Sequence, residues 1–371
     1  MAYCIIPISW NLFEQLQNIK MREIEIGNRL IGDNHKPFII AEMSGNHNGD
    51  IARALELVKA AADSGAHALK LQTYTADTIT INHSGGLFDI SDKNSLWYGR
   101  NLYDLYQEAH TPWEWHKEIF DYAKSLGMLA FSSPFDETAV DFLMDLEVPA
   151  FKIASFESNH FPLLKKVAQT GRPILISSGT SKLNELYESV NYLKANGAKE
   201  IVIFKCTSTY PATPENTNLN TIPVFQSVFE DNVIGLSDHT MGIGASVAAV
   251  ALGARVIEKH FTLRRADGGV DSDFSLEPEE LKSLVVETER AFLAMGKTQL
   301  DTQKAEEKSR QFKRSIYVSS DIKAGEVLTH ENIRVIRPGD GLSPRYFEEV
   351  LGKKVKKDLT KGTPFELGFL G

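Results

Sequence analysis

The sequence predicts an α/β protein, a (β/α)8 TIM barrel followed by a small C-terminal domain. Eight short apolar runs recur between residues 38 and 261, with amphipathic stretches between them. The runs are apolar throughout and do not alternate with polar residues, which is typical of parallel strands buried on both faces. Most of the amphipathic stretches end at a glycine, as connections from a helix to the next strand commonly do.

The elements follow one another in a regular order. The predicted strands are residues 38–43, 68–74, 128–133, 150–155, 174–178, 201–207, 233–237 and 256–261. The predicted helices are residues 54–64, 113–126, 162–170, 183–196, 244–252 and 277–295. An open doubly wound sheet has the same local pattern. The barrel is favoured because no Gly-x-Gly-x-x-Gly follows the first strand, and because polar residues stand at the ends of nearly all eight runs.

The chain is predicted to contain four parts. Residues 1–20 read as an N-terminal extension, or else as an ordered arm that packs on the body or on a partner subunit. Residues 21–297 form the barrel and residues 298–312 a charged linker. Residues 313–371 carry short β-like pieces and many turn signals. A domain of this small size is expected to be only marginally stable without a supporting surface. A long insertion at residues 75–111 follows the second strand, where rim loops often cover substrates.

Composition excludes several classes of protein. The 371 residues include 40 basic and 49 acidic side chains, a net charge of −9, which argues against a nucleic-acid partner. No apolar run approaches the ~20 residues of a membrane span. Cys4 and Cys206 are too few for a disulfide framework, so free thiols in the cytoplasm are expected. Residues 310–371 hold 12 basic and 8 acidic side chains, a net charge of +4, whereas the remainder carries −13.

Charged side chains interrupt the apolar runs near their carboxyl ends, where catalytic groups of barrels lie. Lys70 and Lys152 are costly inside a strand unless each has an anionic partner. One interpretation is internal ion pairs with Glu42 or Glu258. The other is a binding site for a phosphate or carboxylate, for which two lysines and a ring of serines supply charge and hydroxyl donors.

Two histidines end neighbouring strands of the predicted barrel. His239 and His260 would lie about 5 Å apart in the backbone, close enough to share a divalent metal ion. Alternatively, they are hydrogen-bonded polar residues at the barrel mouth. Asp238 is expected to orient His239.

These residues lie in motifs that resemble the sialic acid synthase family. The motifs are Ile40-Ala-Glu42 with Asn46-His-Asn-Gly49, Lys70-Leu-Gln72, Phe151-Lys-Ile-Ala-Ser155, Ile176-Ser-Ser-Gly179, Cys206-Thr-Ser-Thr-Tyr210, Gly235-Leu-Ser-Asp-His239 and Glu258-Lys-His260. The C-terminal part, with Arg314-Ser-Ile-Tyr-Val and Arg337-Pro-Gly-Asp-Gly, resembles that family's antifreeze-protein-like (SAF) domain of β-clip fold. The resemblance runs from about residue 21 to residue 371.

Within that family, the chain is similar to the branch that makes pseudaminic acid. Leu96-Trp-Tyr-Gly-Arg100, Ala109-His-Thr-Pro-Trp-Glu-Trp-His116 and Ala154-Ser-Phe-Glu157 carry this likeness. The resemblance implies a transferase that condenses phosphoenolpyruvate and water with 2,4-diacetamido-2,4,6-trideoxy-β-L-altropyranose, in its open-chain form, to release phosphate. Ser208 stands where neuraminate synthases commonly have asparagine, so its contact with the ligand is expected to differ.

The resemblance also implies a role for each site residue. Phosphoenolpyruvate would be held by Lys70, Ser133, Lys152, Ser155, Ser177, Ser208 and Ser237. Glu42 would act as general acid and base, and Mn²⁺ or Mg²⁺ on His239 and His260 would polarise the sugar aldehyde. Sugar contacts would come from Gln72, Tyr210 and Asp271. Arg337 would reach the N-acetyl group from the other subunit of a domain-swapped homodimer.

Two other functions stay open. The first is an N-acetylneuraminate or legionaminate synthase, which differs in its sugar substrate. The second is a non-catalytic sugar-binding protein, which the presence of Glu42, Lys70, Lys152, His239 and His260 disfavours.

Overall fold

The computed structural model describes residues 22–371 except residue 94. The predicted extension at residues 1–20 lies outside the described residues. The chain divides into two compact units, the first ending at Gly296 and the second comprising Lys297–Gly371. Each unit is described by itself below.

The first unit is built on a closed parallel barrel. Its strands are β3 (Phe38–Glu42), β4 (Ala68–Thr73), β5 (Leu129–Pro134), β6 (Phe151–Ile153), β7 (Ile174–Ser177), β8 (Ile201–Cys206), β9 (Val233–Asp238) and β10 (Val256–His260). They pair in chain order, and β10 pairs with β3 to close the ring. Residue His260 lies opposite Glu42 in that closing pair. The predicted barrel is therefore confirmed, and the open sheet is excluded.

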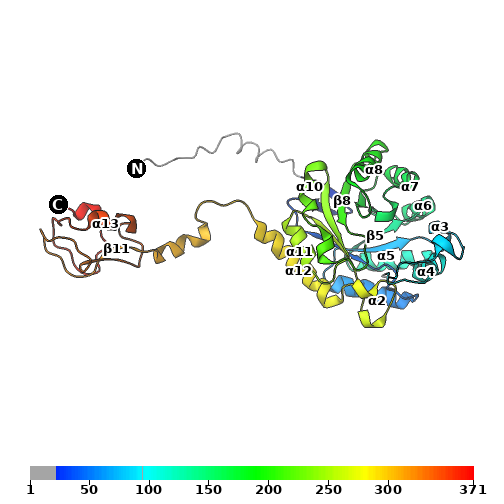
Figure 1. Cartoon of the computed structure of the whole chain (residues 1–371), viewed down its shortest axis with the longest axis horizontal. Coiled ribbons are helices and arrows are strands. Elements are labelled where there is room, and N and C mark those ends of the chain that lie inside the picture. Colours follow the sequence, from blue (N-terminus) through cyan, green and yellow to red (C-terminus); the bar gives the residue numbers. More distant parts are fainter. Residues whose placement is uncertain (1–21, 94) are drawn as a thin grey trace. The chain divides into compact units, whose positions relative to one another are not determined.

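Helices surround the barrel (Figure 1). They are α2 (Ile51–Asp63), α5 (His116–Ser125), α6 (Glu137–Asp145), α7 (Phe161–Ala168), α8 (Leu183–Ala195), α10 (Thr221–Val228), α11 (Gly244–Ala251) and α12 (Pro278–Met295). Both α6 and α10 are additional to the sequence prediction. None of the helices in the described part of the chain has the length and apolarity that crossing a bilayer requires.

A β-hairpin covers the amino-terminal end of the barrel. It consists of β1 (Glu23–Ile26) and β2 (Arg29–Gly32), paired antiparallel. Ile24, Ile26 and Ile31 are buried in the barrel core. The missing side chain at Gly27 lets the turn approach Leu129 at the start of β5. The hairpin therefore closes the end of the barrel opposite the strand termini that carry the polar groups.

The 75–111 insertion contains short elements held by hydrogen bonds. These are α3 (Ala76–Ile79), the 3-10 turn η1 (Gly86–Phe88) and α4 (Leu102–Ala109), and the turn η2 (Trp113–Trp115) follows them. Asn101 caps α4 by accepting from Tyr103 N. The Asn101 side-chain amide also donates to His83 O at 2.9 Å and to Asp89 Oδ1 at 2.8 Å. One asparagine thus joins both ends of the loop between η1 and α4.

The second unit has its own small core. Its elements are η6 (Lys304–Phe312), β11 (Ser315–Val318), β12 (Ile333–Ile336), η7 (Pro344–Tyr346), α13 (Phe347–Val350), η8 (Leu367–Phe369) and several isolated β-bridges. β11 and β12 pair antiparallel. Ile316, Val318, Ile333 and Phe365 are almost wholly buried in its core. Arg337 lies exposed directly after β12.

Candidate active site at the carboxyl end of the barrel

The carboxyl ends of the barrel strands bring together a set of buried charged and polar side chains. Glu42, Lys70, Lys152 and Glu258 are each at most 4% exposed, although all four carry ionisable groups. Isolated charges in a protein interior cost several kcal/mol each, so such a set must compensate its own charge. The contacts among these side chains show how this happens.

Lys70 on β4 lies between two carboxylates. Its Nζ is 2.9 Å from Glu42 Oε2 on β3 and 3.6 Å from Glu258 Oε1 on β10. It also donates a hydrogen bond to Ser133 Oγ on β5 at 3.2 Å. Each contact comes from a different strand, since neighbouring parallel strands align their side chains at the same level of the barrel.

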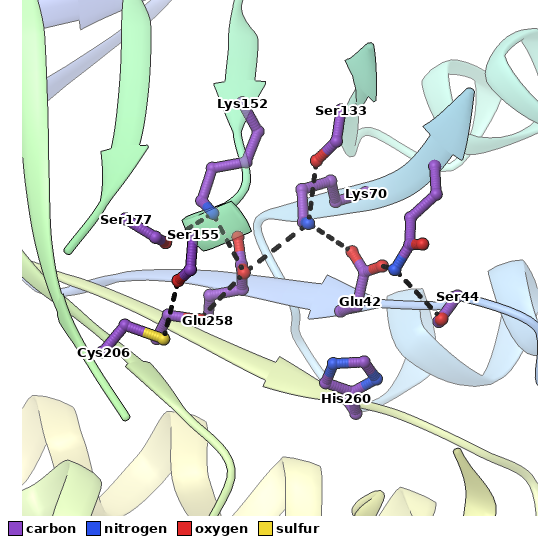
Figure 2. A network of polar contacts seen from close by, with 12 residues as sticks. Glu42, Ser44, Lys70, Ser133, Lys152, Ser155, Ser177, Cys206, Glu258 and His260 are labelled. Carbon is purple, nitrogen blue, oxygen red and sulfur yellow. Dashed lines mark hydrogen bonds and ion pairs between the residues drawn. The ribbon is translucent and has the colours of Figure 1, made fainter. Parts of the chain in front are cut away.

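Lys152 on β6 completes the group from the opposite side (Figure 2). Its Nζ donates to Ser177 Oγ on β7 at 2.7 Å and lies 3.7 Å from Glu258 Oε1. Ser237 Oγ donates to the same Glu258 oxygen at 3.1 Å. Glu258 is therefore the anion shared by both lysines. The ion pairs that the sequence left as one alternative are present, and an anionic ligand would have to compete with them.

Burial and charge shift the pKa values of the two glutamates in opposite directions. Burial raises the pKa of Glu42, and nearby Glu258 adds to the effect against the opposing attraction of Lys70. Burial also acts to raise the pKa of Glu258, but Lys152, Lys70 and His239 together outweigh it and hold that pKa below its ordinary value. Paired carboxyls with pKa values moved apart are typical of acid–base sites. Glu42 is the one suited to carry a proton.

Ser155 and Ser208 converge on Cys206 beside Lys152. Ser155 Oγ donates to Cys206 Sγ at 3.4 Å, and Ser208 Oγ lies 3.8 Å from the same sulfur. A Cβ on Gly179 would stand 2.0 Å from Ser208 Oγ and 2.5 Å from Ser155 Oγ. Glycine is therefore required where β7 runs into its loop, because any larger residue would fill the space in which the hydroxyls meet.

A second polar network extends from Glu42 away from the lysines. Gln72 Nε2 donates to Glu42 Oε1 at 3.0 Å and to Ser44 Oγ at 3.1 Å. Ser44 Oγ donates in turn to a carboxylate oxygen of Asp271. Asp271 Oδ2 lies 3.8 Å from His260 Nδ1. Gln72 and Asp271, which the sequence assigns to the sugar, are thus brought into one chain of contacts.

The two histidines face each other at the barrel mouth. The ring centroids of His239 and His260 are 5.4 Å apart, and Tyr210 packs 4.6 Å from the His239 ring. His239 Nδ1 is 2.9 Å from Thr207 O, so this nitrogen carries the proton, and the ring also makes a side-chain hydrogen bond with Cys206. His260 Nδ1 is buried, and no hydrogen-bond partner is found for it in the described part of the chain. Within residues 22–371, residue 94 aside, no cluster of three or more His, Cys, Asp or Glu is arranged to hold a metal.

The expected role of Asp238 is wrong. Its carboxylate accepts from Thr240 N at 2.9 Å and from Ser246 Oγ at 2.6 Å, and it pairs with Lys259 at 3.1 Å. None of the hydrogen bonds found for it in the described residues goes to His239. Asp238 points to the outer side of the barrel and anchors the loop after β9, while a backbone carbonyl orients His239.

Glu157 is a functional candidate that the sequence reasoning passed over. It lies in the turn η3 (Ser155–Glu157) after β6. Its Oε2 is a buried oxygen for which no hydrogen-bond partner is found among the described residues. Burial raises its pKa from 4.5 to about 7, against the attraction of Lys152 and Lys70. Its position two residues beyond Ser155, in a strand-end motif, was the available signal.

All the predicted site residues except Arg337 belong to the first unit, and they lie at the same end of the barrel. Arg337 belongs to the second unit.

Comparison with known proteins agrees with this geometry. The model of the NeuB family matches residues 57–300, and that of the SAF domain matches residues 313–367. The chain belongs to the NeuB family. This confirms the resemblance to sialic acid synthases that the motifs indicated.

Individual relatives cover nearly the whole chain. A pseudaminic acid synthase of Campylobacter jejuni is 44% identical over 345 residues, which span 93% of this chain and 99% of that protein. An N,N'-diacetyllegionaminic acid synthase of the same species is 38% identical over 331 residues, 87% of this chain and 97% of that protein. The crystal structure of N-acetylneuraminic acid synthetase from Leptospira borgpetersenii in complex with citrate superposes with a TM-score of 0.69 and 32% identity, covering 78% of this chain and 95% of that one.

The raised pKa of Glu157 predicts a pH-dependent contribution to stability. A carboxyl whose pKa is raised on folding favours the folded state while it is protonated. This contribution is complete below pH 4.5 and is lost as the pH rises to about 7. Glu157→Gln cannot ionise. We therefore expect the variant to gain stability relative to wild type by about 2 to 3 kcal/mol between pH 5 and pH 8.

Urea unfolding of both proteins at the two pH values measures this difference. Glu188→Gln, at an exposed position on α8, is the matched control and should show no such change with pH. Parallel stability curves for wild type and Glu157→Gln would contradict the assignment.

Proposed function

We propose that this chain is a pseudaminic acid synthase. It condenses phosphoenolpyruvate with the open-chain form of a 2,4-diacetamido-2,4,6-trideoxy-L-altrose and with water, and it releases phosphate. The observation that carries the proposal is the pair of buried lysines surrounded by serine hydroxyls at the barrel mouth. The higher identity to the pseudaminic acid synthase than to the legionaminic acid synthase, 44% against 38%, supports the choice of sugar.

Phosphoenolpyruvate would bind between Lys70 and Lys152. Its phosphate and carboxylate carry several negative charges, and the hydroxyls of Ser133, Ser155, Ser177, Ser208 and Ser237 offer further donors. Before the ligand arrives, Glu42 and Glu258 neutralise the lysines. Lysines held in place by these carboxylates need no large rearrangement to meet an anion, which is the main requirement of electrostatic catalysis.

The histidines fit a divalent metal. A buried His260 Nδ1, for which no hydrogen-bond partner is found among the described residues, is a suitable donor. His239 would supply a ring nitrogen in place of its hydrogen bond with Cys206, and the substrate or water would supply oxygen ligands. We propose that His239 and His260 hold Mn²⁺ or Mg²⁺. When bound, such an ion polarises the sugar aldehyde as a Lewis acid.

Two carboxyl groups would transfer protons during the bond-forming steps. Carbon 3 of phosphoenolpyruvate attacks carbon 1 of the aldehyde, and Glu42 donates its proton to the aldehyde oxygen, which becomes a hydroxyl. Water then adds at the cationic carbon 2 and loses one proton. The tetrahedral intermediate expels phosphate by cleavage of the C–O bond, the second proton of the water leaves with the phosphate, and carbon 2 becomes the keto carbon. The Glu157 carboxyl, with a pKa of about 7, is suited to accept the proton that the water loses.

The sugar would lie along the second network. Gln72 and Asp271 present an amide and a carboxylate to its hydroxyls, and Tyr210 presents the face of its ring. Gln72 also contacts Glu42, so the group that binds the sugar and the group that transfers the proton are held together.

The buried free thiol of Cys206 fits a reducing compartment, and we place the enzyme in the cytoplasm.

Sugar-dependent release of phosphate tests the function. With phosphoenolpyruvate and the trideoxy altrose, we expect turnover and a nine-carbon keto-acid product, identified by mass spectrometry and NMR. Glu42→Gln should lower kcat by about 10² or more, because the proton donor is lost. Faster turnover with N-acetylmannosamine or with the legionaminate precursor would assign a different synthase. Binding of sugar without any product would indicate a non-catalytic protein.

Removal of the metal tests the histidine assignment. Treatment with a chelator should abolish turnover, and added Mn²⁺ or Mg²⁺ should restore it, because Lewis-acid activation of the aldehyde is lost without the ion. His260→Ala should bind less metal by elemental analysis, whereas His35→Ala, in the turn that follows β2, should bind as much as wild type. Full activity in a metal-free sample would refute the proposed site.

We further propose a domain-swapped homodimer in which Arg337 of one subunit contacts the N-acetyl group of the sugar bound to the other. Opposite net charges, +4 for residues 310–371 and −13 for the remainder, support association between subunits. Arg337→Ala should raise the KM for the sugar about tenfold with little change in kcat, while Arg334→Ala on β12 serves as the matched control. The mass in solution is the direct measurement, and a fully active monomer would disprove the swap.

A further inference from the structure

Trp97 occupies the inner side of the 75–111 insertion. Its neighbours Leu96 and Tyr98 are 44% and 53% exposed, whereas Trp97 itself is half-buried. The backbone around it is fixed, since Trp97 N donates to Ser95 Oγ at 3.2 Å and Arg100 N donates to Trp97 O at 3.1 Å. The insertion thus presents one large aromatic side chain toward the body of the barrel and leaves the two beside it in solvent.

The indole is tied to the loop that carries Asp271. Trp97 Nε1 donates to Val270 O at 3.0 Å, and the next residue, Asp271, accepts from Ser44. Gly45 permits this arrangement, because a Cβ there would stand 2.5 Å from Val270 Cγ2. Trp97 therefore reaches the same end of the site as the Gln72–Asp271 network, and its only polar atom is already satisfied.

Trp97 also belongs to a cluster of aromatic rings at the barrel mouth. Its ring centroid is 5.7 Å from that of Tyr210, which in turn lies 5.3 Å from Phe274 and 4.6 Å from His239. The three rings Trp97, Tyr210 and Phe274 come from three different loops. Together they form an apolar surface directly beside the polar groups that would bind sugar hydroxyls.

We propose that Trp97 is a specificity-determining residue, which forms with Tyr210 an apolar wall that accepts the terminal methyl group of a 6-deoxy sugar and disfavours a hydroxymethyl group. This inference rests on the proposed function and extends it to one side chain. Aromatic faces pack well against methyl groups but give a hydroxyl no hydrogen-bond partner. With Nε1 bound to Val270 O, the indole cannot serve a sugar hydroxyl either.

The expected selectivity is moderate. An apolar pocket rejects an analogue that merely adds a hydroxyl by about 10²-fold at most. We therefore expect wild type to prefer the 6-deoxy diacetamido sugar over its 6-hydroxy counterpart by about 10- to 100-fold in kcat/KM. Recognition of the acetamido groups and of phosphoenolpyruvate should not depend on this wall.

The test compares kcat/KM for the two sugars in wild type, Trp97→Ala, Trp97→Phe and Tyr98→Ala. Trp97→Ala should reduce the preference for the 6-deoxy sugar about tenfold and leave the KM for phosphoenolpyruvate unchanged. Trp97→Phe, which keeps an aromatic face, should retain most of the preference. Tyr98→Ala is the matched control, because its side chain faces solvent, and it should behave as wild type.

Two results would overturn the inference. One is an unchanged sugar preference in Trp97→Ala, with both KM values for sugar raised equally, which would mean that the indole only supports the insertion. The other is equal saturation transfer to the methyl group of the 6-deoxy sugar in wild type and in Trp97→Ala, measured by saturation-transfer NMR. The NMR measurement needs no turnover, so it tests the wall separately from the proposed reaction, whose own failure would appear as absence of product from either sugar in wild type.

Discussion

Compensation of four buried charges is the constraint on which the rest of the site depends. Glu42, Lys70, Lys152 and Glu258 come from four strands and leave the barrel interior electrically neutral as a group. Removing one member would leave an unpaired charge where water cannot reach it, at a cost of about 3 to 5 kcal/mol. The same arrangement that makes burial tolerable also keeps two ammonium groups ready for an anionic ligand.

The surrounding groups extend this charge balance to the chemistry. Because Glu258 is shared by both lysines and receives a hydrogen bond from Ser237, it remains ionised. Glu42 pairs with one lysine and is approached by Gln72, and burial leaves it the better proton carrier. Two carboxyls of the same type, both within reach of Lys70, thus have pKa values shifted in opposite directions, because burial prevails at Glu42 whereas Lys152, Lys70 and His239 together outweigh it at Glu258.

Much of the fold could be predicted because buried parallel strands leave a clear sequence pattern. All eight apolar runs correspond to barrel strands. Helices α6 and α10 were missed, since Leu146 and Phe229, which follow them, are not glycines.

Among site residues, lysines inside apolar runs were conspicuous. Glu157 was passed over, because its position two residues beyond Ser155 does not by itself show that its carboxyl is buried. For Asp238, side-chain direction decided the outcome, and adjacency in sequence to His239 was misleading.

Closure of the barrel has a consequence for when the site can exist during synthesis. The ring is completed by pairing β10 with β3, which sets His260 opposite Glu42 and places Glu258 beside Lys70. A growing chain therefore lacks the anion shared by both lysines until the last barrel strand has left the ribosome. Any product truncated before β10 lacks both the shared anion and one histidine, so the charge balance of the site depends on the last strand of the barrel.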